Sequence, residues 1–329
     1  MHVIDLHCDT LMLAYLHGFS RPPEELDLYG MPGSVDLKRL HQAGAMAQFF
    51  AVFLPPAPFF DRAGVQLISD QEYIRFCRAV LDSALKKHPD ISSAACSAEE
   101  IRRNYAAGKV SAVFSMEDGR AVDGNLENLQ QFHEMGIRAI SLTWNGENCL
   151  GFPNSSDPAV MARGLTPFGK EAVRCMQELG ILVDVSHLSD GGFYDVARIC
   201  TRPFVATHSN CRTLAPHPRN LTDAMIWLLG EKGGVAELNF GPEFLNRDPA
   251  CKDSTAAAIA AHARHMADTG GEDCVAIGSD FDGIQGNLEI GDSAQMDRLE
   301  YALREAGFTP RQIDKLCFGN VLRVMEDAL

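Results

Sequence analysis

The stretch VIDLHCDT, residues 3–10, places His7 and Asp9 two positions apart within a strand-like run. Residues i and i+2 of a β-strand point to the same side, so these two side chains are expected to share a face, with Asp5 further back on it. An imidazole beside a carboxylate could hold one metal ion. It could also form a hydrogen-bonded pair at the rim of a core, and residues elsewhere in the chain must decide between the two.

Three histidines and two carboxylates come at or near the ends of short apolar runs: His7, Asp9, Glu117, His187 and His208. Taken singly, a histidine at a strand end is commonly structural, and Glu117 could cap a helix while its neighbour Asp118 rivals it for any role. Taken together, they offer the nitrogen and oxygen ligands that suit Zn²⁺. Five ligands exceed what one open catalytic zinc needs, and one carboxylate can bridge two metals. The set predicts a two-zinc site, with Glu117 as the bridge between the His7/Asp9 pair and the His187/His208 pair.

Arg219 lies in the segment THSNCRTLAPHPRN, shortly after His208. Its guanidinium could be an ordinary surface charge. Near a metal site it would also be a good clamp for a substrate carboxylate, because its fork of N–H groups matches the two oxygens. His217 lies close by, and no role is assigned to it.

The last apolar run ends in GSDFDG, which supplies Asp280 and Asp282. Asp280 comes first after the run, where a carboxylate could act as acid or base toward a metal-bound water. Asp282 is expected to organise the turn with the glycine that follows it. His262 and His265 fall on a predicted helix away from the other candidates, and we interpret them as structural.

Eight short apolar runs are typical of buried strands and recur along the chain. They span residues 3–9, 45–54, 111–118, 137–145, 181–187, 203–209, 234–240 and 274–282. Segments with helical periodicity lie between them, at residues 70–88, 125–136, 166–180 and 254–271. Strand–helix alternation implies parallel pairing, which leaves a closed (β/α)₈ barrel or a doubly wound open sheet.

The polar ends of these runs favour the barrel. In an open sheet only the strands beside the switch point should carry chemistry. Barrel active sites form at the carboxyl ends of strands around the whole ring. Candidate residues here extend from the first run, with His7, to the eighth, with Asp280. We therefore expect one domain over residues 1–329, an α/β fold of the TIM-type (β/α)₈ class with its metal site at the C-terminal strand ends.

Composition narrows the class of partner. The 329 residues carry a formal net charge of -15, which argues against nucleic acid or an anionic membrane as the main partner. The ten cysteines are scattered singly, as expected for thiols in a reducing compartment. No secretion-signal pattern opens the sequence, and no run of about 18 apolar residues occurs. These features predict a cytoplasmic protein.

Several motifs resemble those of the renal or membrane dipeptidase family, peptidase family M19 of the amidohydrolase-like barrels. They are DLHCDT, VDLKRLHQAGAMAQFF, MEDG, GLTPFGKEAVRCMQELGILVDVSHLS, PFVATHSNCRTLAPHPRNLTD, AIGSDFDG and FGNVLRVM, and they extend over almost the whole chain. The resemblance implies a zinc pair held by the ligand set already derived. It also implies Arg219 as the group that binds the C-terminal carboxylate of the substrate, Asp280 as the catalytic proton carrier, and a homodimer.

Two positions depart from the pattern of the animal members of that family. Those members carry a histidine in an LTH motif that is thought to contact the substrate, whereas this chain has LTWN, with Trp144 in that place and Asn145 after it. They also place a tyrosine after NF, where this chain has Gly241. Both changes concern substrate positioning, and we expect Trp144 and Asn145 to contact the substrate.

The expected reaction is hydrolysis of a dipeptide by a hydroxide that bridges the two metals, with Asp280 taking the proton and returning it to the departing amine. Arg219 would fix the far end of the substrate, so that binding measures its length. A lactonase, deaminase or phosphotriesterase on the same barrel is an alternative, and a substrate without a free carboxylate would leave Arg219 idle. A non-catalytic, metal-bound scaffold is the weaker alternative, because no ligand of the ring is missing.

Overall fold

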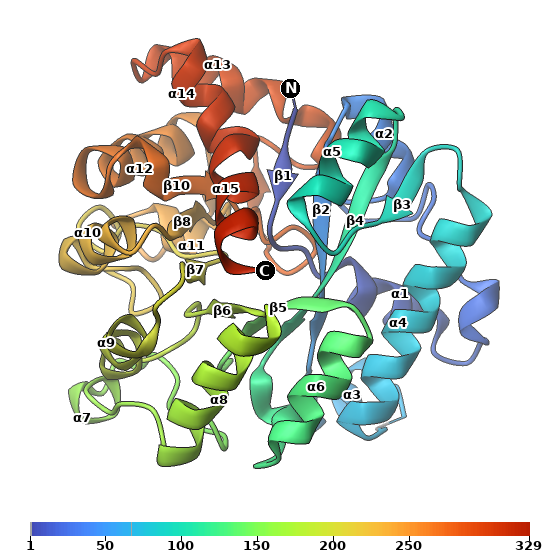
Figure 1. Ribbon diagram of the computed structural model, residues 1–329. Helices are drawn as coiled ribbons and strands as arrows, with labels where there is room; N and C mark the ends of the chain where they lie inside the picture. Colours follow the sequence, from blue (N-terminus) through green and yellow to red (C-terminus); the bar gives the residue numbers. More distant parts are fainter. Residues whose placement is uncertain (1, 67) are drawn as a thin grey trace.

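Eight parallel strands pair in a closed ring in the computed structural model, which describes residues 2–66 and 68–329 (Figure 1). Seven of the eight predicted runs contain one of these strands, and β4 begins at Val110, one residue before its run. The ring follows chain order and closes where β1 pairs with both β2 and β10. The predicted (β/α)₈ barrel is therefore confirmed. Its strands are β1 (Ile4–Asp5), β2 (Ala47–Phe53), β4 (Val110–Glu117), β5 (Ile137–Ser141), β6 (Leu182–Asp184), β7 (Val205–Ala206), β8 (Val235–Leu238) and β10 (Val275–Ile277).

Except for β4, the paired strands are shorter than the apolar runs that predicted them. The first run was expected to stay extended through Asp9, but β1 ends at Asp5, and Asp9 has a non-extended backbone with φ -98° and ψ 24°. The predicted strand alternation is therefore wrong beyond Asp5. Three further strands were not predicted: β3 (Ser92–Ala94), which pairs with the first residues of β4, and β9 (Asp253–Ser254) with β11 (Asn287–Leu288), which form a separate two-stranded sheet.

Four helices match the predicted segments within two residues at each end. They are α4 (Asp70–Lys87), α6 (Leu126–Glu134), α8 (Pro167–Leu179) and α12 (Ala256–Gly270). Each begins after a residue whose side chain accepts a hydrogen bond from an N–H of the first turn, which satisfies one of the donors that the helix leaves unpaired. These capping residues are Ser69, Asn125, Thr166 and Thr255.

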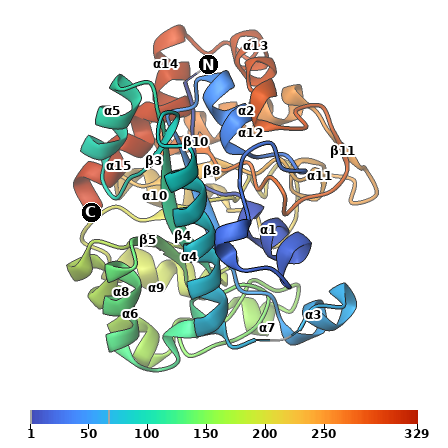
Figure 2. The same cartoon turned by 90° about the vertical axis from the view of Figure 1, so that its right-hand side faces the viewer.

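The other helices surround the ring or cap its loops. They are α1 (Thr10–Gly18), α2 (Leu37–Ala43), α3 (Ala57–Ala63), α5 (Ala98–Ala106), α7 (Pro158–Met161), α9 (Asp190–Ile199), α10 (Asp223–Glu231), α11 (Pro242–Leu245), α13 (Asp297–Glu305), α14 (Pro310–Asp314) and α15 (Asn320–Ala328). Short helical turns occur at Pro23–Glu25, Gly119–Val122, Glu272–Cys274, Ser293–Gln295 and Lys315–Gly319. Figure 2 shows the long α4 along the outside of the barrel. No helix in the described part of the chain is long and apolar enough to span a membrane.

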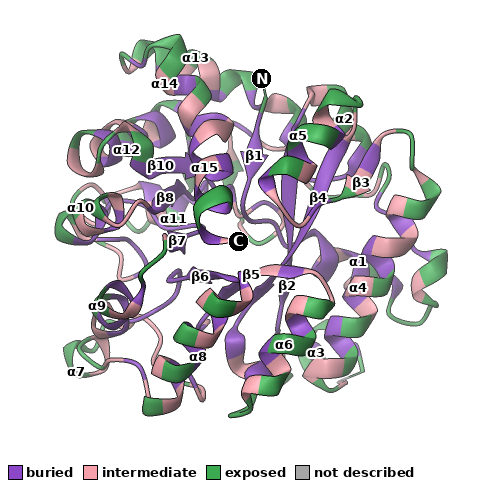
Figure 3. Cartoon of the chain, viewed as in Figure 1, coloured by how far each residue is buried: buried purple, intermediate pink, exposed green. Residues whose placement is uncertain are grey.

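A buried apolar cluster fills the barrel at the amino ends of its strands. Every strand of the ring contributes to it, and Val235 and Val205 do so from the first positions of β8 and β7. Val321, Val324 and other residues of α15 belong to the same cluster, so this helix closes that end of the barrel. In Figure 3 the strands are buried, while the surrounding helices expose only their outer faces. The opposite end, where the strands finish, is left for chemistry.

Candidate active site

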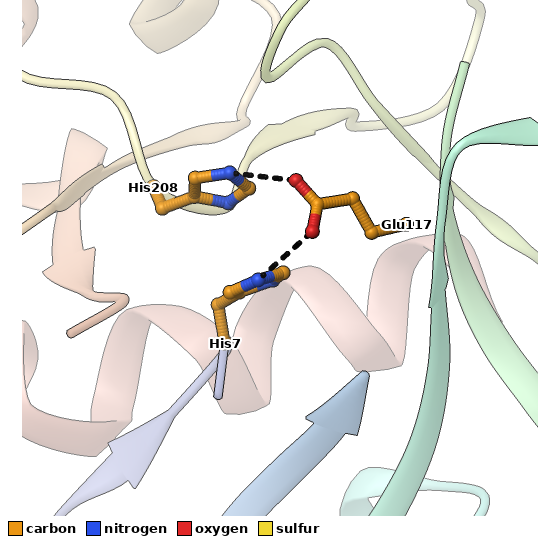
Figure 4. Close-up of side chains that lie close together, drawn as sticks. All are labelled: His7, Glu117 and His208. Atoms are coloured by element: carbon orange, nitrogen blue, oxygen red, sulfur yellow. Dashed lines mark ion pairs between the residues drawn. The ribbon is translucent and has the colours of Figure 1, made fainter. Parts of the chain in front are cut away.

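The carboxyl ends of five strands bring the predicted metal ligands and the predicted proton carrier together. Glu117 is the last residue of β4, whereas the others follow β1, β6, β7 and β10 in the connecting segments. Figure 4 shows His7 and His208 facing different oxygens of Glu117. The cluster consists of His7, Asp9, Glu117, His187, His208 and Asp280, and all but Asp280 are buried.

Glu117 lies at the centre of this cluster and directs its two oxygens to different histidines. Its Oε2 is 3.5 Å from Nε2 of His7, while its Oε1 is 2.8 Å from Nε2 of His187 and 3.3 Å from Nε2 of His208. Burial alone would raise the pKa of Glu117, but the imidazoles hold it well below its usual range. The rival Asp118 turns away and accepts hydrogen bonds from Arg120 and Asn148. The geometry therefore suits Glu117 to a shared position between two groups of ligands.

His7 faces three carboxylates. Its Nε2 lies 3.8 Å from Oδ1 of Asp9 and 3.9 Å from Oδ1 of Asp280, in addition to Glu117. Burial would lower the pKa of His7, yet these carboxylates raise it to about 10, which shows how strongly this position favours a positive charge. Two overlapping sets could each hold a metal ion: His7 with Glu117 and His208, and His7 with Asp9 and Asp280.

Two buried polar atoms without hydrogen-bond partners bear on whether these residues can bind a metal ion. Nε2 of His7 and Oδ1 of Asp9 are buried without a hydrogen-bond partner, although buried polar atoms are nearly always paired. Asp9 precedes α1 but does not use its carboxylate to cap that helix. Burial lowers the pKa of His187 to about 4 and holds that of His208 well below its usual value, so both rings are neutral, as metal ligands must be. The donor set fits a metal ion.

Hydrogen bonds on the far side of two histidine rings direct Nε2 toward Glu117. Nδ1 of His187 lies 3.2 Å from Oδ1 of Asn145, and Nδ1 of His208 lies 2.9 Å from the Thr207 hydroxyl. Such contacts fix the ring orientation and the tautomer of metal-binding histidines. Asn145 was predicted to contact substrate, and the structure places its side-chain oxygen against His187. Thr207 was not predicted at all.

Asp280 lies beside His7 with a backbone φ of 62°, in the left-handed region. The Asn239 amide donates a 2.8 Å hydrogen bond to its Oδ2. Burial raises the pKa of Asp280 to about 6, against the opposing charge of His7, so its proton affinity suits an acid or base near neutral pH. Gly283 is required here, because a Cβ would come within 2.2 Å of Asp9 Oδ2 and 2.6 Å of Asp280 Oδ1.

Asp282 was expected to organise the turn with Gly283, but its carboxylate instead joins this turn to two distant segments. It accepts hydrogen bonds from the Thr10 hydroxyl and from the Ser34 N–H, both 2.6 Å long, and it stays out of the metal-ligand cluster. His262 is also structural, as predicted: it is buried and bonds to the N–H of Cys211 and the carbonyl of Leu245.

A cavity of about 270 Å³ opens above the ligands. Arg219 on its wall is only 6% exposed, and its Nη1 and Nη2 donate to the Ser209 hydroxyl and the His208 carbonyl at 3.1 and 3.2 Å. Its Nε is buried without a partner. Trp144 packs edge-on against Phe53, with 4.9 Å between the ring centroids. The remaining lining side chains beyond the ligand cluster are Met12, Phe59, Asn145, Glu243, Phe244 and Ile284.

A comparison with known protein families identifies the family that this chain matches. The model of the membrane dipeptidase family, peptidase family M19, matches residues 1–329. The chain belongs to this family. It is therefore a metallo-hydrolase that acts on peptide bonds, and membership of a dipeptidase family implies dipeptide substrates.

Two solved structures and one sequence relative support the M19 assignment. A metallopeptidase from Rhodobacter sphaeroides, liganded with a phosphinate mimic of L-Ala-D-Ala, is 29% identical with a TM-score of 0.87, over 100% of this chain and 99% of that one. A dipeptidase AC of family M19 is 30% identical with a TM-score of 0.86, over 100% and 98%. An uncharacterised dipeptidase from Schizosaccharomyces pombe is 31% identical over 90% of this chain and 72% of its own.

One departure from the animal M19 enzymes has a visible structural counterpart. At Gly241 a Cβ would come within 2.9 Å of a Phe244 ring carbon and 3.1 Å of an Ile284 methyl carbon. Those two side chains occupy the space that a tyrosine at this position would need. Phe244 and Ile284 give the cavity an apolar wall near Arg219.

Proposed function

We propose that this M19 enzyme is a two-zinc dipeptidase. His7 and Asp9 would hold one zinc ion, His187 and His208 the other, and Glu117 would bridge them. The observation that carries the proposal is the division of the two Glu117 oxygens, one facing His7 and the other facing His187 and His208. Bound zinc ions supply Lewis acidity that polarises a carbonyl and lowers the pKa of water.

Asp280 is the proton carrier in this proposal. Its carboxylate takes the proton of the attacking water and returns it to the departing amine. The hydrogen bond from the Asn239 amide holds Oδ2 in place and leaves Oδ1 facing the His7 side of the site. A carboxyl pKa near 6 allows both transfers at neutral pH.

Arg219 sets the length of the substrate. The Ser209 hydroxyl and the His208 carbonyl hold its guanidinium beside the ligands, and Arg219 lines the cavity, where a carboxylate could bind it. A C-terminal carboxylate bound here lies one residue from a peptide bond at the metals, which selects dipeptides. Trp144 and Phe53 offer an aromatic surface to the remainder of the substrate, and Asn145 orients His187 at the edge of the same cavity.

Two measurements on one preparation test the proposal. Protein purified without chelator should contain about two zinc ions per chain. It should hydrolyse a panel of L-L and L-D dipeptides in preference to tripeptides, N-acylated dipeptides and lactones. A zinc content near zero that added zinc does not restore, or preference for a lactone, would refute it. A cytoplasmic location and a homodimer stay predictions, to be checked by cell fractionation and by light scattering.

A further inference from the structure

Two buried aspartates behind the site make the same set of hydrogen bonds. Asp5 is 2% exposed and ends β1. Its Oδ1 accepts from the N–H of His7 at 3.2 Å and from the N–H of Ser279 at 2.9 Å. Its Oδ2 accepts from the Ser279 hydroxyl at 2.6 Å.

Asp184 repeats this arrangement at β6, which it ends, and it is 3% exposed. Its Oδ1 accepts from the N–H of Ser186 at 2.9 Å and from the N–H of Thr207 at 3.0 Å. Its Oδ2 accepts from the Thr207 hydroxyl at 2.5 Å. The two aspartates occupy equivalent positions in the barrel. Asp5 pairs with Ile277 on the adjacent strand, and Asp184 pairs with Val205. Each carboxylate binds the residue two positions after the aspartate and the residue two positions after its pairing partner.

Each carboxylate therefore joins a different pair of site segments. Asp5 joins the segment of His7 to the segment of Asp280, whereas Asp184 joins those of His187 and His208. Each also binds a residue that precedes one with a left-handed backbone. Asp5 binds Ser279, before Asp280 with a φ of 62°, and Asp184 binds Ser186, before His187 with a φ of 66°. Such conformations cost free energy in residues other than glycine and persist where surrounding contacts hold them.

The direction of the hydrogen bonds extends the effect of Asp184 to a ligand ring. A carboxylate only accepts, so the single Thr207 hydroxyl hydrogen goes to Asp184, and the Thr207 oxygen accepts from Nδ1–H of His208. That tautomer leaves the lone pair of Nε2 directed toward Glu117. An asparagine at 184 that keeps its oxygen on the two N–H groups presents NH₂ to Thr207. The hydroxyl then turns toward Nδ1, and the proton moves to Nε2, where it blocks metal binding.

We propose that Asp5 and Asp184 are positioning residues that each organise one half of the metal centre, Asp5 the His7 half and Asp184 the half of His187 and His208. This inference rests on the two-zinc function proposed above. Its consequence is that loss of one carboxylate weakens one metal position and spares the other.

Zinc retention tests this assignment independently of activity. Zinc-loaded wild type, Asp184→Asn, Asp5→Asn and the double variant are equilibrated with chelators of graded strength, and zinc per chain is measured by elemental analysis. We expect two tightly held ions in the wild type, and one in each single variant, with the second weakened about 10- to 100-fold. The double variant should lose both, because the two carboxylates act on different positions.

Thr207 provides a milder pair of variants if an aspartate variant does not fold. Thr207→Val removes the relay to His208 and should weaken one ion, whereas Thr207→Ser keeps the hydroxyl and should restore wild-type retention. Two tight ions in every variant, or retention of one tight ion in the double variant, would overturn the inference while the two-zinc function stands. Equal loss from Thr207→Ser and Thr207→Val would overturn it as well. Fewer than two ions in the wild type would overturn both proposals.

Discussion

Replacement of Arg219 by alanine is the sharpest test of how this enzyme selects its substrate. The guanidinium is almost fully buried, and burial lowers the pKa of Arg219, opposed by the charges of Asp280 and Glu117. Two of its nitrogens are held by Ser209 and by the His208 carbonyl, while Nε has no partner. A substrate carboxylate would meet a preorganised and partly desolvated cation.

The expected loss follows from that burial. Truncation of one partner of a buried, hydrogen-bonded charge pair costs about 2–5 kcal/mol. At 1.36 kcal/mol per factor of ten, Arg219→Ala should lower kcat/KM for free dipeptides by about 30-fold to several thousand-fold. Ser209→Ala is the matched control, since it removes one hydrogen bond to the guanidinium and keeps the charge. A hydrogen bond to a charged group contributes about 1.5–3 kcal/mol, so the loss should be at most about 10- to 160-fold, below the upper part of the range expected for Arg219→Ala.

The assay compares each dipeptide with its C-terminal amide. Amides should be poor substrates of the wild type, and Arg219→Ala should change their rate little. Zinc content is measured in each variant, because Arg219 also contacts the carbonyl of His208. Equal cleavage of a dipeptide and its amide by the wild-type enzyme would refute the carboxylate clamp.

Three other predictions concern the metal centre and the core. Glu117→Gln removes the charge shared by both ligand groups, so zinc content should fall toward one ion per chain and kcat/KM by at least about 100-fold; near wild-type turnover with both ions bound would contradict the bridge. Chelation should lower the melting temperature, because an ion present at about a thousand times its Kd contributes about 4 kcal/mol, and added zinc should restore it in calorimetry. Burial lowers the pKa of His262 to about 4 from 6.5, so the unfolded chain binds the extra proton between these values. His262 should therefore contribute a decrease of about 3 kcal/mol in the free energy of unfolding as pH falls from 6.5 to 4, and the decrease measured in urea titrations should be smaller by this amount in His262→Gln; equal decreases in the two proteins would exclude this contribution.

The barrel and its ligand cluster could be predicted because both depend on local patterns. Each strand of the ring is buried on both faces and reads as an apolar run, and the functional side chains come where those runs turn polar. β3 could not be found this way, since Ser92–Ala94 is short, partly exposed and paired only with the start of β4. His7 and Asp9 meet as predicted but not on a regular strand, because the continuous pairing of β1 ends at Asp5 and Asp9 has a non-extended backbone.

Residues that act through another strand could not be predicted from one sequence. Asp184 and Thr207 are 23 positions apart and meet only because β6 and β7 pair in a particular register. Asn145 reaches His187 across 42 positions for the same kind of reason. One regularity was visible: an aspartate two residues before His7 is matched by one three residues before His187. The role of these two aspartates became clear only from their hydrogen bonds in the structure.

The position of the helix α15 determines how substrate enters the enzyme and how products leave it. Because it and the apolar cluster beneath the ligands fill the barrel axis, the described residues close the base of the cavity, which opens on the strand-end side. A peptide cannot thread past the metals, and both amino acids produced must leave by the way the substrate entered. Substrate entry and product release therefore use the same opening of the cavity. Changes to the loops around that opening can alter turnover without touching either the chemistry or the sealed floor that stabilises the fold.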